Sequence, residues 1–287
     1  MNNKSFHRIF FLLLLSSFSS FSQTPEDAKK KYPIRKVINK NNTVVSTSAT
    51  PITDANFQDA INTCLATFAY RVDGMCSDSE YGAMPTWDVS QVTDMSYAFS
   101  NNWYFNGDLS AWDTSNVKTM RSMFENAYDF NQPLNDWDVS NVTDMYEMLA
   151  NMSDFNQDLN SWDVSSVTDM GKMFKMSEIF NGDISSWDVS SVTNMKSMFS
   201  DADGFNQDIG NWDVSSVTDM RWMFSHAFVF NQDLSGWCVT NITEEEVMPG
   251  FNLGYSGLSE SNLPIWGTCQ NSSSDYNFCD DDGDGIM

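Results

Sequence analysis

The chain repeats one pattern of hydrophobic and polar residues with a period of 25 residues. Each period carries a tryptophan, followed at fixed offsets by columns rich in valine, methionine and phenylalanine. The tryptophans are Trp87, Trp112, Trp137, Trp162, Trp187, Trp212 and Trp237. A period of about 20 to 50 residues is typical of solenoids, propellers and arrays of small units. Because 25 residues are too few for a propeller blade or a helix pair, the pattern predicts a solenoid of stacked coils.

One copy of the repeat shows which elements to expect. The segment LNSWDV at 159–164 has the L-x-x-L-x-L form of a leucine-rich-repeat strand, with tryptophan substituted. The segment TDMGKMF at 168–174 spaces Met170, Met173 and Phe174 as in a short helix, which Thr168 or Asp169 can cap. The predicted fold class is α/β: a leucine-rich-repeat-like solenoid with one short parallel strand plus a short helix or 3₁₀ turn in each coil.

The turn FNQDL closes each coil, and its asparagine is expected to satisfy buried backbone groups. Capping regions are expected at both ends, because a terminal coil would otherwise expose an apolar cross-section. We expect a helical cap at 52–86, six coils at 87–236 and a second cap at 237–269. Asp54 is the predicted N-cap of the first cap's helix. The apolar face of that helix comprises Phe57, Ala60, Ile61, Cys64 and Leu65.

The first 51 residues differ in composition from the repeats. Residues 1–22 place Lys4 and Arg8 before a short apolar run, which is typical of a secretory signal peptide. No cysteine stands near the expected cleavage position to take a lipid. Residues 23–51 are polar and predict a flexible linker. The expected location is therefore outside a bacterial cell, either secreted or at the cell surface, without membrane insertion after cleavage.

These repeats resemble the BspA-like leucine-rich-repeat surface proteins, whose 25-residue units read WDVSxVTDMxxMFxxAxxFNQDL. The resemblance covers roughly residues 54–269. It implies a non-enzymatic, adhesin-like protein that contacts an extracellular protein or glycan through the sheet face of the solenoid. The alternative function is a structural spacer or stalk that presents a downstream domain.

The net charge limits the classes of partner. The formal charge of the whole chain is −24. Removing the two basic residues of the signal leaves 13 Lys and Arg against 39 Asp and Glu, a charge of −26. Such a chain should repel nucleic acid and anionic membranes. We expect a monomer with no nucleic-acid partner.

The cysteines lie outside the repeated coils. In an exported chain, pairing is the default expectation for cysteines. The favoured disulfides are Cys64 with Cys76 and Cys238 with Cys269, one at each cap, and Cys279 is left over. A metal site is the rival interpretation, although neither C-x-x-C nor clustered histidine is present.

The sequence predicts no enzymatic activity. His226 is the one histidine after the signal, and the chain has no G-x-S-x-G, H-E-x-x-H or P-loop motif. The many carboxylates recur once per coil, as structural residues do. Catalytic residues are therefore expected to be none.

One aspartate column provides the ligand-face candidates. It lies between the Trp and Val columns and should face solvent. Its members are Asp88, Asp113, Asp138, Asp163, Asp188 and Asp213. Carboxylates stacked at about 4.8 Å repel one another, so something must offset the repulsion. Either each aspartate accepts hydrogen bonds from the Ser or Thr just after it or from backbone amides in the turn, or the column binds cations or a basic partner.

The acidic tail at 270–287 is the other candidate cation site. Its CDDDGDG segment resembles the start of a calcium-binding repeat, with Asp280, Asp282 and Asp284 as oxygen ligands of a weak calcium site. The alternative is a disordered acidic tail. No other cofactor is expected.

Overall fold

The computed structural model describes residues 51–66, 72–76, 79–243, 251 and 256–269, and the backbone of two short strands. These strands are β1 (Val37–Ile38) and β2 (Val44–Val45), which pair antiparallel. The other elements are helix α2 (Phe57–Leu65) and the 3₁₀ helices η3 (Met84–Thr86) and η4 (Glu260–Asn262). The expected signal peptide, the acidic tail and most of the expected linker lie outside the described residues.

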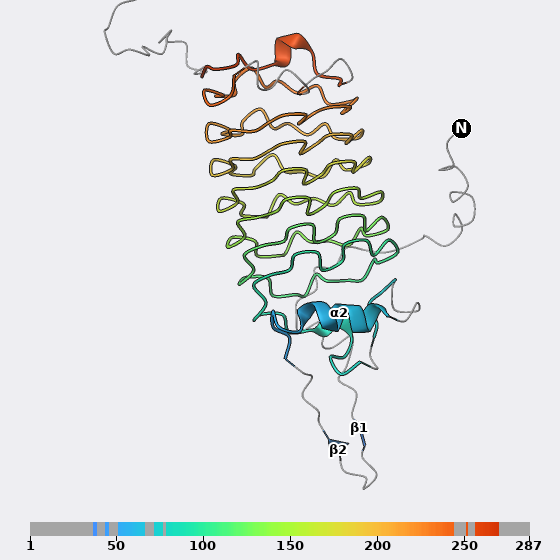
Figure 1. The fold of residues 1–287 in the computed structure, drawn as a ribbon. Helices are drawn as coiled ribbons and strands as arrows, with labels where there is room; N and C mark the ends of the chain where they lie inside the picture. The colour runs from blue at the N-terminus through green and yellow to red at the C-terminus, as the bar shows by residue number, and fades with distance from the viewer. Residues whose placement is uncertain are drawn as a thin grey trace, which may run out of the picture.

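The repeats form a stack of coils, with α2 across one end and η4 near the other (Figure 1). Each coil is joined to the next by a parallel bridge of a single residue. These bridges run through Asp94, Thr119, Asp144, Asp169, Asn194 and Asp219. Equivalent residues of successive repeats therefore lie side by side, as the period of 25 residues predicted.

The predicted α/β class is wrong. In the described coils at 87–243, the structure contains turns and single bridges, and neither the predicted strand nor the predicted helix. The expected strand at 159–164 contains a turn instead, in which the Trp162 N–H donates to the Leu159 carbonyl at 3.1 Å. The parallel contacts between coils lie in the TDM segment rather than in LxxWxV.

Left-handed backbone conformations explain why TDMxxMF does not form a helix. Two residues of each coil have positive φ, one inside this segment and one two residues after it; in the third coil they are Glu147 at 55° and Asn151 at 55°. A right-handed helix cannot include such residues. The N–H groups of Met145, Glu147 and Leu149 point to the next coil and donate to its carbonyls at 2.9, 2.9 and 3.0 Å. The pairing between coils thus replaces the i to i−4 bonds of a helix.

The turns bury the same residues that a helix with this spacing would bury. Met170, Met173 and Phe174 are fully buried, and the Met173 N–H donates to the Met170 carbonyl at 3.2 Å. A run of tight turns returns a side chain to the core about every three residues, as a helix does. Burial with spacing i, i+3, i+4 therefore cannot distinguish the two conformations.

The tryptophan column forms the centre of the core. Each of the seven side chains is at most 4% exposed. Neighbouring rings stack, as for Trp112 and Trp137, whose centroids are 6.4 Å apart. The indole N–H also bonds to the preceding coil, where Trp162 Nε1 donates to the Leu134 carbonyl at 2.8 Å. Each Trp therefore contributes both apolar burial and a satisfied buried donor.

The asparagines of the FN turns form a ladder along the stack, but the backbone N–H groups that they accept belong to partly or fully exposed residues and not to the buried ones that were predicted. The Oδ1 of Asn106 accepts the backbone N–H of Asn131 at 3.0 Å, and the Oδ1 of Asn131 accepts that of Asn156 at 3.0 Å. The series continues through Asn181 and Asn206 to Asn231. Each coil thereby specifies the position of the next one.

Helix α2 covers the first coil with the predicted apolar face, Phe57, Ala60, Ile61, Cys64 and Leu65. The predicted N-cap is wrong, because Asn56 occupies that position and no side chain caps the helix. Asp54 instead accepts the N–H groups of Thr93 and Asp94 at 2.7 and 3.1 Å and the Thr93 hydroxyl at 2.7 Å. In later coils the equivalent N–H groups bond to the preceding coil, so Asp54 substitutes for a coil that is absent.

Both disulfides that the sequence analysis favoured are present, Cys64–Cys76 beside α2 and Cys238–Cys269 at the far end. At the far end, the chain at 256–269 also pairs with the last coil. The Val239 N–H donates to the Thr268 carbonyl at 2.8 Å, and the Leu234 N–H donates to the Asn262 carbonyl at 2.9 Å. Cys279 lies outside the described residues.

Replacing Asp54 with Ala should lower the free energy of unfolding by about 1–2 kcal/mol, because two backbone donors lose their acceptor. Partial burial acts to raise the pKa of Asp54, but the hydrogen bonds from Thr93 and Asp94 hold it below its usual 3.8. A depressed native pKa stabilises the fold above the unfolded pKa, and this contribution is lost as pH falls through the native value. The Asp54→Ala effect should therefore be full at neutral pH and shrink below about pH 4.

Urea unfolding at several pH values measures this effect. Asp59→Ala is the control, since Asp59 is an exposed carboxylate on α2 that caps no coil. An equal loss of stability in the two variants would contradict the capping role of Asp54.

Deleting residues 162–186 removes one whole period and should leave a folded, slightly less stable stack, because repeat stability is a sum over neighbouring units. Deleting 162–173 should abolish cooperative unfolding, because the Trp column then falls out of register. Calorimetry compares the two deletions. Equal tolerance of both would show that the register between coils does not stabilise the fold.

Candidate interaction surface

Two positions in each coil vary while the residues around them repeat. They follow the methionine column and are called here the variable row. Its pairs are Ser96 and Tyr97, Arg121 and Ser122, Tyr146 and Glu147, Gly171 and Lys172, Lys196 and Ser197, and Arg221 and Trp222. The row begins two residues after the bridge residues, so its members stack from coil to coil.

The backbone imposes one conformation on the row whatever its side chains are. The second residue of each pair has φ between 50° and 60°, as in Glu147 at 55° and Trp222 at 59°. In the described pairs up to Ser197, its N–H donates to the carbonyl of the first residue in the next pair, for example from Lys172 to Lys196 at 2.8 Å. β-Branched residues are disfavoured at positive φ, and none occurs here. The scaffold therefore tolerates most other side chains at these positions.

The bridge residues orient the first position of the row. Asp144 Oδ1 accepts the Tyr146 N–H at 2.9 Å, and Asp169 Oδ1 accepts the Gly171 N–H at 2.9 Å. Burial raises the pKa of Asp169, and the neighbouring Asp144 charge adds to the rise. The Asp144 and Asp169 carboxylates thus hold the backbone at the first position of the row in place.

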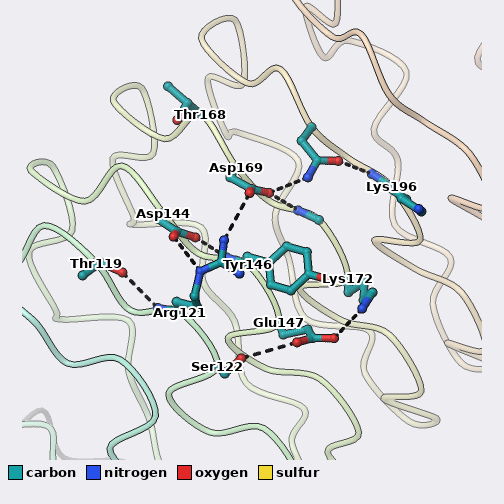
Figure 2. Close-up of polar contacts among 12 residues, drawn as sticks. Thr119, Arg121, Ser122, Asp144, Tyr146, Glu147, Thr168, Asp169, Lys172 and Lys196 are labelled. Atoms are coloured by element: carbon teal, nitrogen blue, oxygen red, sulfur yellow. Dashed lines mark hydrogen bonds and ion pairs between the residues drawn. The ribbon is translucent and has the colours of Figure 1, made fainter.

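The row gathers positive charge in a strongly acidic protein. The coils at 87–243 contain six basic residues, and all six lie in TDMxxMF segments or at the residue after them. They are Lys118, Arg121, Lys172, Lys175, Lys196 and Arg221. Figure 2 shows that Arg121 reaches across two coils, with Nε 2.9 Å from Asp144 Oδ2 and Nη2 3.6 Å from Asp169 Oδ2.

Tyr146 lies between two cations from neighbouring coils (Figure 2). The Arg121 guanidinium is 4.3 Å and the Lys172 ammonium 5.0 Å from the centre of its ring. Lys172 also pairs with Glu147 at 2.7 Å. Gly171 makes room for this cluster, because a Cβ there would lie 3.0 Å from the Tyr146 ring and 2.7 Å from Asn194 Nδ2. The middle of the row is thus a packed, charge-balanced cluster.

A second aromatic and basic cluster ends the row. Lys196 and Arg221 lie 5.0 and 5.8 Å from the Trp222 ring centre. Arg221 pairs with Asp219 at 2.6 Å. Partial burial acts to raise the pKa of Asp219, but the hydrogen bonds from Arg221 outweigh burial and lower it. At exposed sites, a contact between a cation and an aromatic face contributes about 0.5–1 kcal/mol of stability.

A pocket of about 610 Å³ opens at the other end of the row, between the start of α2 and the first coil. Its wall includes Tyr97, which is 54% exposed, together with Gln58, Asn101 and Asp94. No lysine or arginine lines it among the described residues. The row therefore runs from a pocket with an exposed aromatic ring and two carboxylates, Asp54 and Asp94, through two clusters of cations and aromatic rings.

The predicted ligand-face aspartates lie on a different part of each coil. They face solvent, and each accepts the backbone N–H of the serine two residues later, for example from Ser140 to Asp138 at 3.1 Å. The Ser140 hydroxyl also donates to Asp138 at 2.7 Å. The same bonds occur at Asp88, Asp113, Asp163 and Asp188, and at Asp213 the backbone bond occurs. The structure therefore provides the hydrogen bonds of the first interpretation.

The variable row was missed in the sequence, although its signal is there. Comparing residues between copies of TDMxxMF finds two positions that change charge and size within a repeated context.

No group of three or more His, Cys, Asp and Glu side chains within the described ranges is arranged to hold a metal ion. The predicted calcium ligands Asp280, Asp282 and Asp284 lie outside these ranges. None of the helices in the part of the chain that the structure describes has the length and apolar character to cross a membrane.

The geometry defines a disulfide-containing repeat protein of stacked 25-residue coils. Residues 70–178 and 143–252 match the family described as "Mycoplasma protein of unknown function, DUF285". Because these matches together cover more than half of the chain, the chain belongs to this family. No curated protein and no solved structure matches the chain.

Calcium should stabilise the protein no more than sodium chloride at equal ionic strength, because the aspartate column already accepts hydrogen bonds from serine. Changing Asp138, Asp163 and Asp188 together to Ala should lower stability by about 1 kcal/mol per site, and Asn should cost less. Thermal unfolding with each salt measures both effects. A large shift specific to calcium that the Asn variant abolishes would establish a cation site instead.

Proposed function

We propose that this is an exported, non-enzymatic binding protein that contacts an extracellular partner through the variable row. The observation that carries the proposal is the contrast between a repeated scaffold and a row that changes in every coil. Tyr, Trp and Arg are enriched where protein interfaces gain most of their binding free energy. Four of the six pairs contain at least one of these residues.

Rigidity supports the proposal. Bonds between coils hold the row on both sides, and ion pairs hold Arg121 and Lys172 in one arrangement. Ordered side chains lose little conformational entropy on binding, which favours affinity. A surface prepared in this way suits recognition of a partner by many simultaneous contacts.

Location outside the cell is part of the proposal. The disulfides at both ends of the stack are typical of oxidising compartments. The resemblance of the repeats to BspA-like surface proteins points in the same direction, and the 1–22 segment has the composition of a signal peptide. We infer a secreted or surface-displayed protein with an adhesin-like role.

A structural spacer is the second candidate. The ladder of bonds between coils would suit it, since it makes the stack stiff along its length. A spacer, however, gains nothing from a row of Arg, Tyr and Trp, because serine occupies the same positions in other coils. Binding measurements separate the two functions.

Arrays of matrix proteins and glycans should reveal a ligand, and the affinity of each hit is then measured with row variants. Arg121→Ser and Trp222→Ser place at each position a residue that other coils already carry there, as in Ser96 and Ser197. Each should weaken binding at least about tenfold, or ~1.4 kcal/mol.

Trp103→Ser is the matched control. Trp103 is 50% exposed and lies two residues before the FN turn, and the equivalent residue of a later coil is Ser153. The Trp103→Ser variant should bind the ligand with the same affinity as the unmodified protein. Binding that survives both row changes would contradict the proposal, and an absence of any ligand would favour the spacer.

A further inference from the structure

The pocket at the first coil differs chemically from the rest of the variable row. With about 610 Å³ it has the size of a small-molecule site. It exists because α2 lies against the first coil, whereas each later row pair has another coil beside it. The pocket is continuous with the row, because the Tyr97 N–H donates to the Arg121 carbonyl at 2.9 Å.

The groups in the pocket suit a polyhydroxylated ligand. Tyr97 exposes an aromatic ring, against which the apolar face of a sugar ring can stack. Gln58, Ser96 and Asn101 supply amide and hydroxyl groups, which both donate and accept hydrogen bonds as sugar hydroxyls do. Asp94 uses Oδ1 to accept the Ser96 N–H at 2.8 Å, which leaves Oδ2 to accept from a ligand.

Asp54 shapes this pocket without contributing a free acceptor. Its oxygens already accept three hydrogen bonds from Thr93 and Asp94 at 2.7 to 3.1 Å. It thereby anchors the start of α2 to the first coil. The pocket is therefore as ordered as the end of the stack itself.

Charge argues against an anionic ligand. An anion would meet the carboxylates of Asp54 and Asp94, and no cation lines the pocket among the described residues. The Arg121 guanidinium extends to Asp144 and Asp169, so it does not neutralise the pocket carboxylates. An uncharged ligand avoids this repulsion.

The rest of the row extends the same chemistry along the stack. Arg121 and Lys172 are neutralised by Asp144 and Glu147 at 2.9 and 2.7 Å. Ion pairs of this kind still offer donors and acceptors at their edges. Row positions of successive coils should lie at roughly the 4.8 Å spacing of paired strands, so their polar groups follow one another along the stack as the units of a linear sugar chain do.

We propose that the Tyr97 pocket binds the end of an uncharged oligosaccharide, whose chain continues along the variable row. This inference rests on the proposed binding function and names the chemical class of its ligand.

The test uses the full chain and an array of four ligand groups. These are neutral hexose and N-acetylhexosamine oligosaccharides, oligosaccharides of equal length that carry uronic acid or sulfate, and a panel of matrix proteins. Neutral oligosaccharides should bind, with an affinity that does not change between low and high salt, because no net charge is neutralised.

Tyr97→Ser should weaken this binding at least about tenfold. Serine occurs at the same row position in Ser122 and Ser197, so the positive φ is retained. Phe228→Ser is the matched control: Phe228 is also 54% exposed, at the far end of the stack, and its equivalent in another coil is Ser153. Unfolding midpoints of both variants show that the fold is intact.

The outcomes separate the two proposals. Binding of acidic oligosaccharides alone, with loss in high salt, would overturn the uncharged ligand and leave the binding function in place. Binding of matrix proteins alone would do the same. Neutral oligosaccharides that bind Tyr97→Ser as tightly as the unmodified protein would overturn the pocket. Failure of every ligand group would overturn both proposals.

Discussion

Backbone hydrogen bonds between successive coils are the interaction on which the rest of this structure depends. The described coils contain neither regular strands nor helices, so their buried N–H and C=O groups need partners elsewhere. Alternate residues of the TDMxxMF segments, from 93–99 to 193–199, donate to the next coil, as Glu147 does to Gly171 at 2.9 Å. This pattern fixes the period at 25 residues, because an inserted residue would leave donors and acceptors out of register.

The side chains that repeat are those that complete this pairing. Trp162 fills the core and bonds to the preceding coil, and Asn131 accepts from the following one. The ends need substitutes for a missing neighbour, which Asp54 provides at the first coil. The row positions take part in the repeated pairing through their backbone, while their side chains differ from coil to coil and form contacts of their own, such as Arg121 with Asp144. Their variation can therefore serve recognition. Scaffold and binding surface are thus separated within a single 25-residue unit.

The sequence predicts the period, the buried columns and the two disulfide pairs, because each depends on residue types that recur or pair in simple ways. It does not predict the secondary structure. Burial of Met170, Met173 and Phe174 fits a helix and a run of turns equally well. Positive φ at Glu147 and Lys172 has no signature in the residues themselves, since glycine and asparagine are the usual signals. The pocket depends on how α2 meets the first coil, which no local pattern specifies.

Hydrogen exchange of individual backbone amides tests the central claim most directly. The amides of Met145, Glu147 and Leu149 donate to the next coil, so they should exchange only when the whole stack opens. The Tyr146 amide donates to the partly exposed Asp144 carboxylate and should exchange much faster. This alternation of slow and fast amides along one segment is the result that the account predicts. Uniform protection through the segment, as in a helix, or rapid exchange of all four amides, would contradict it.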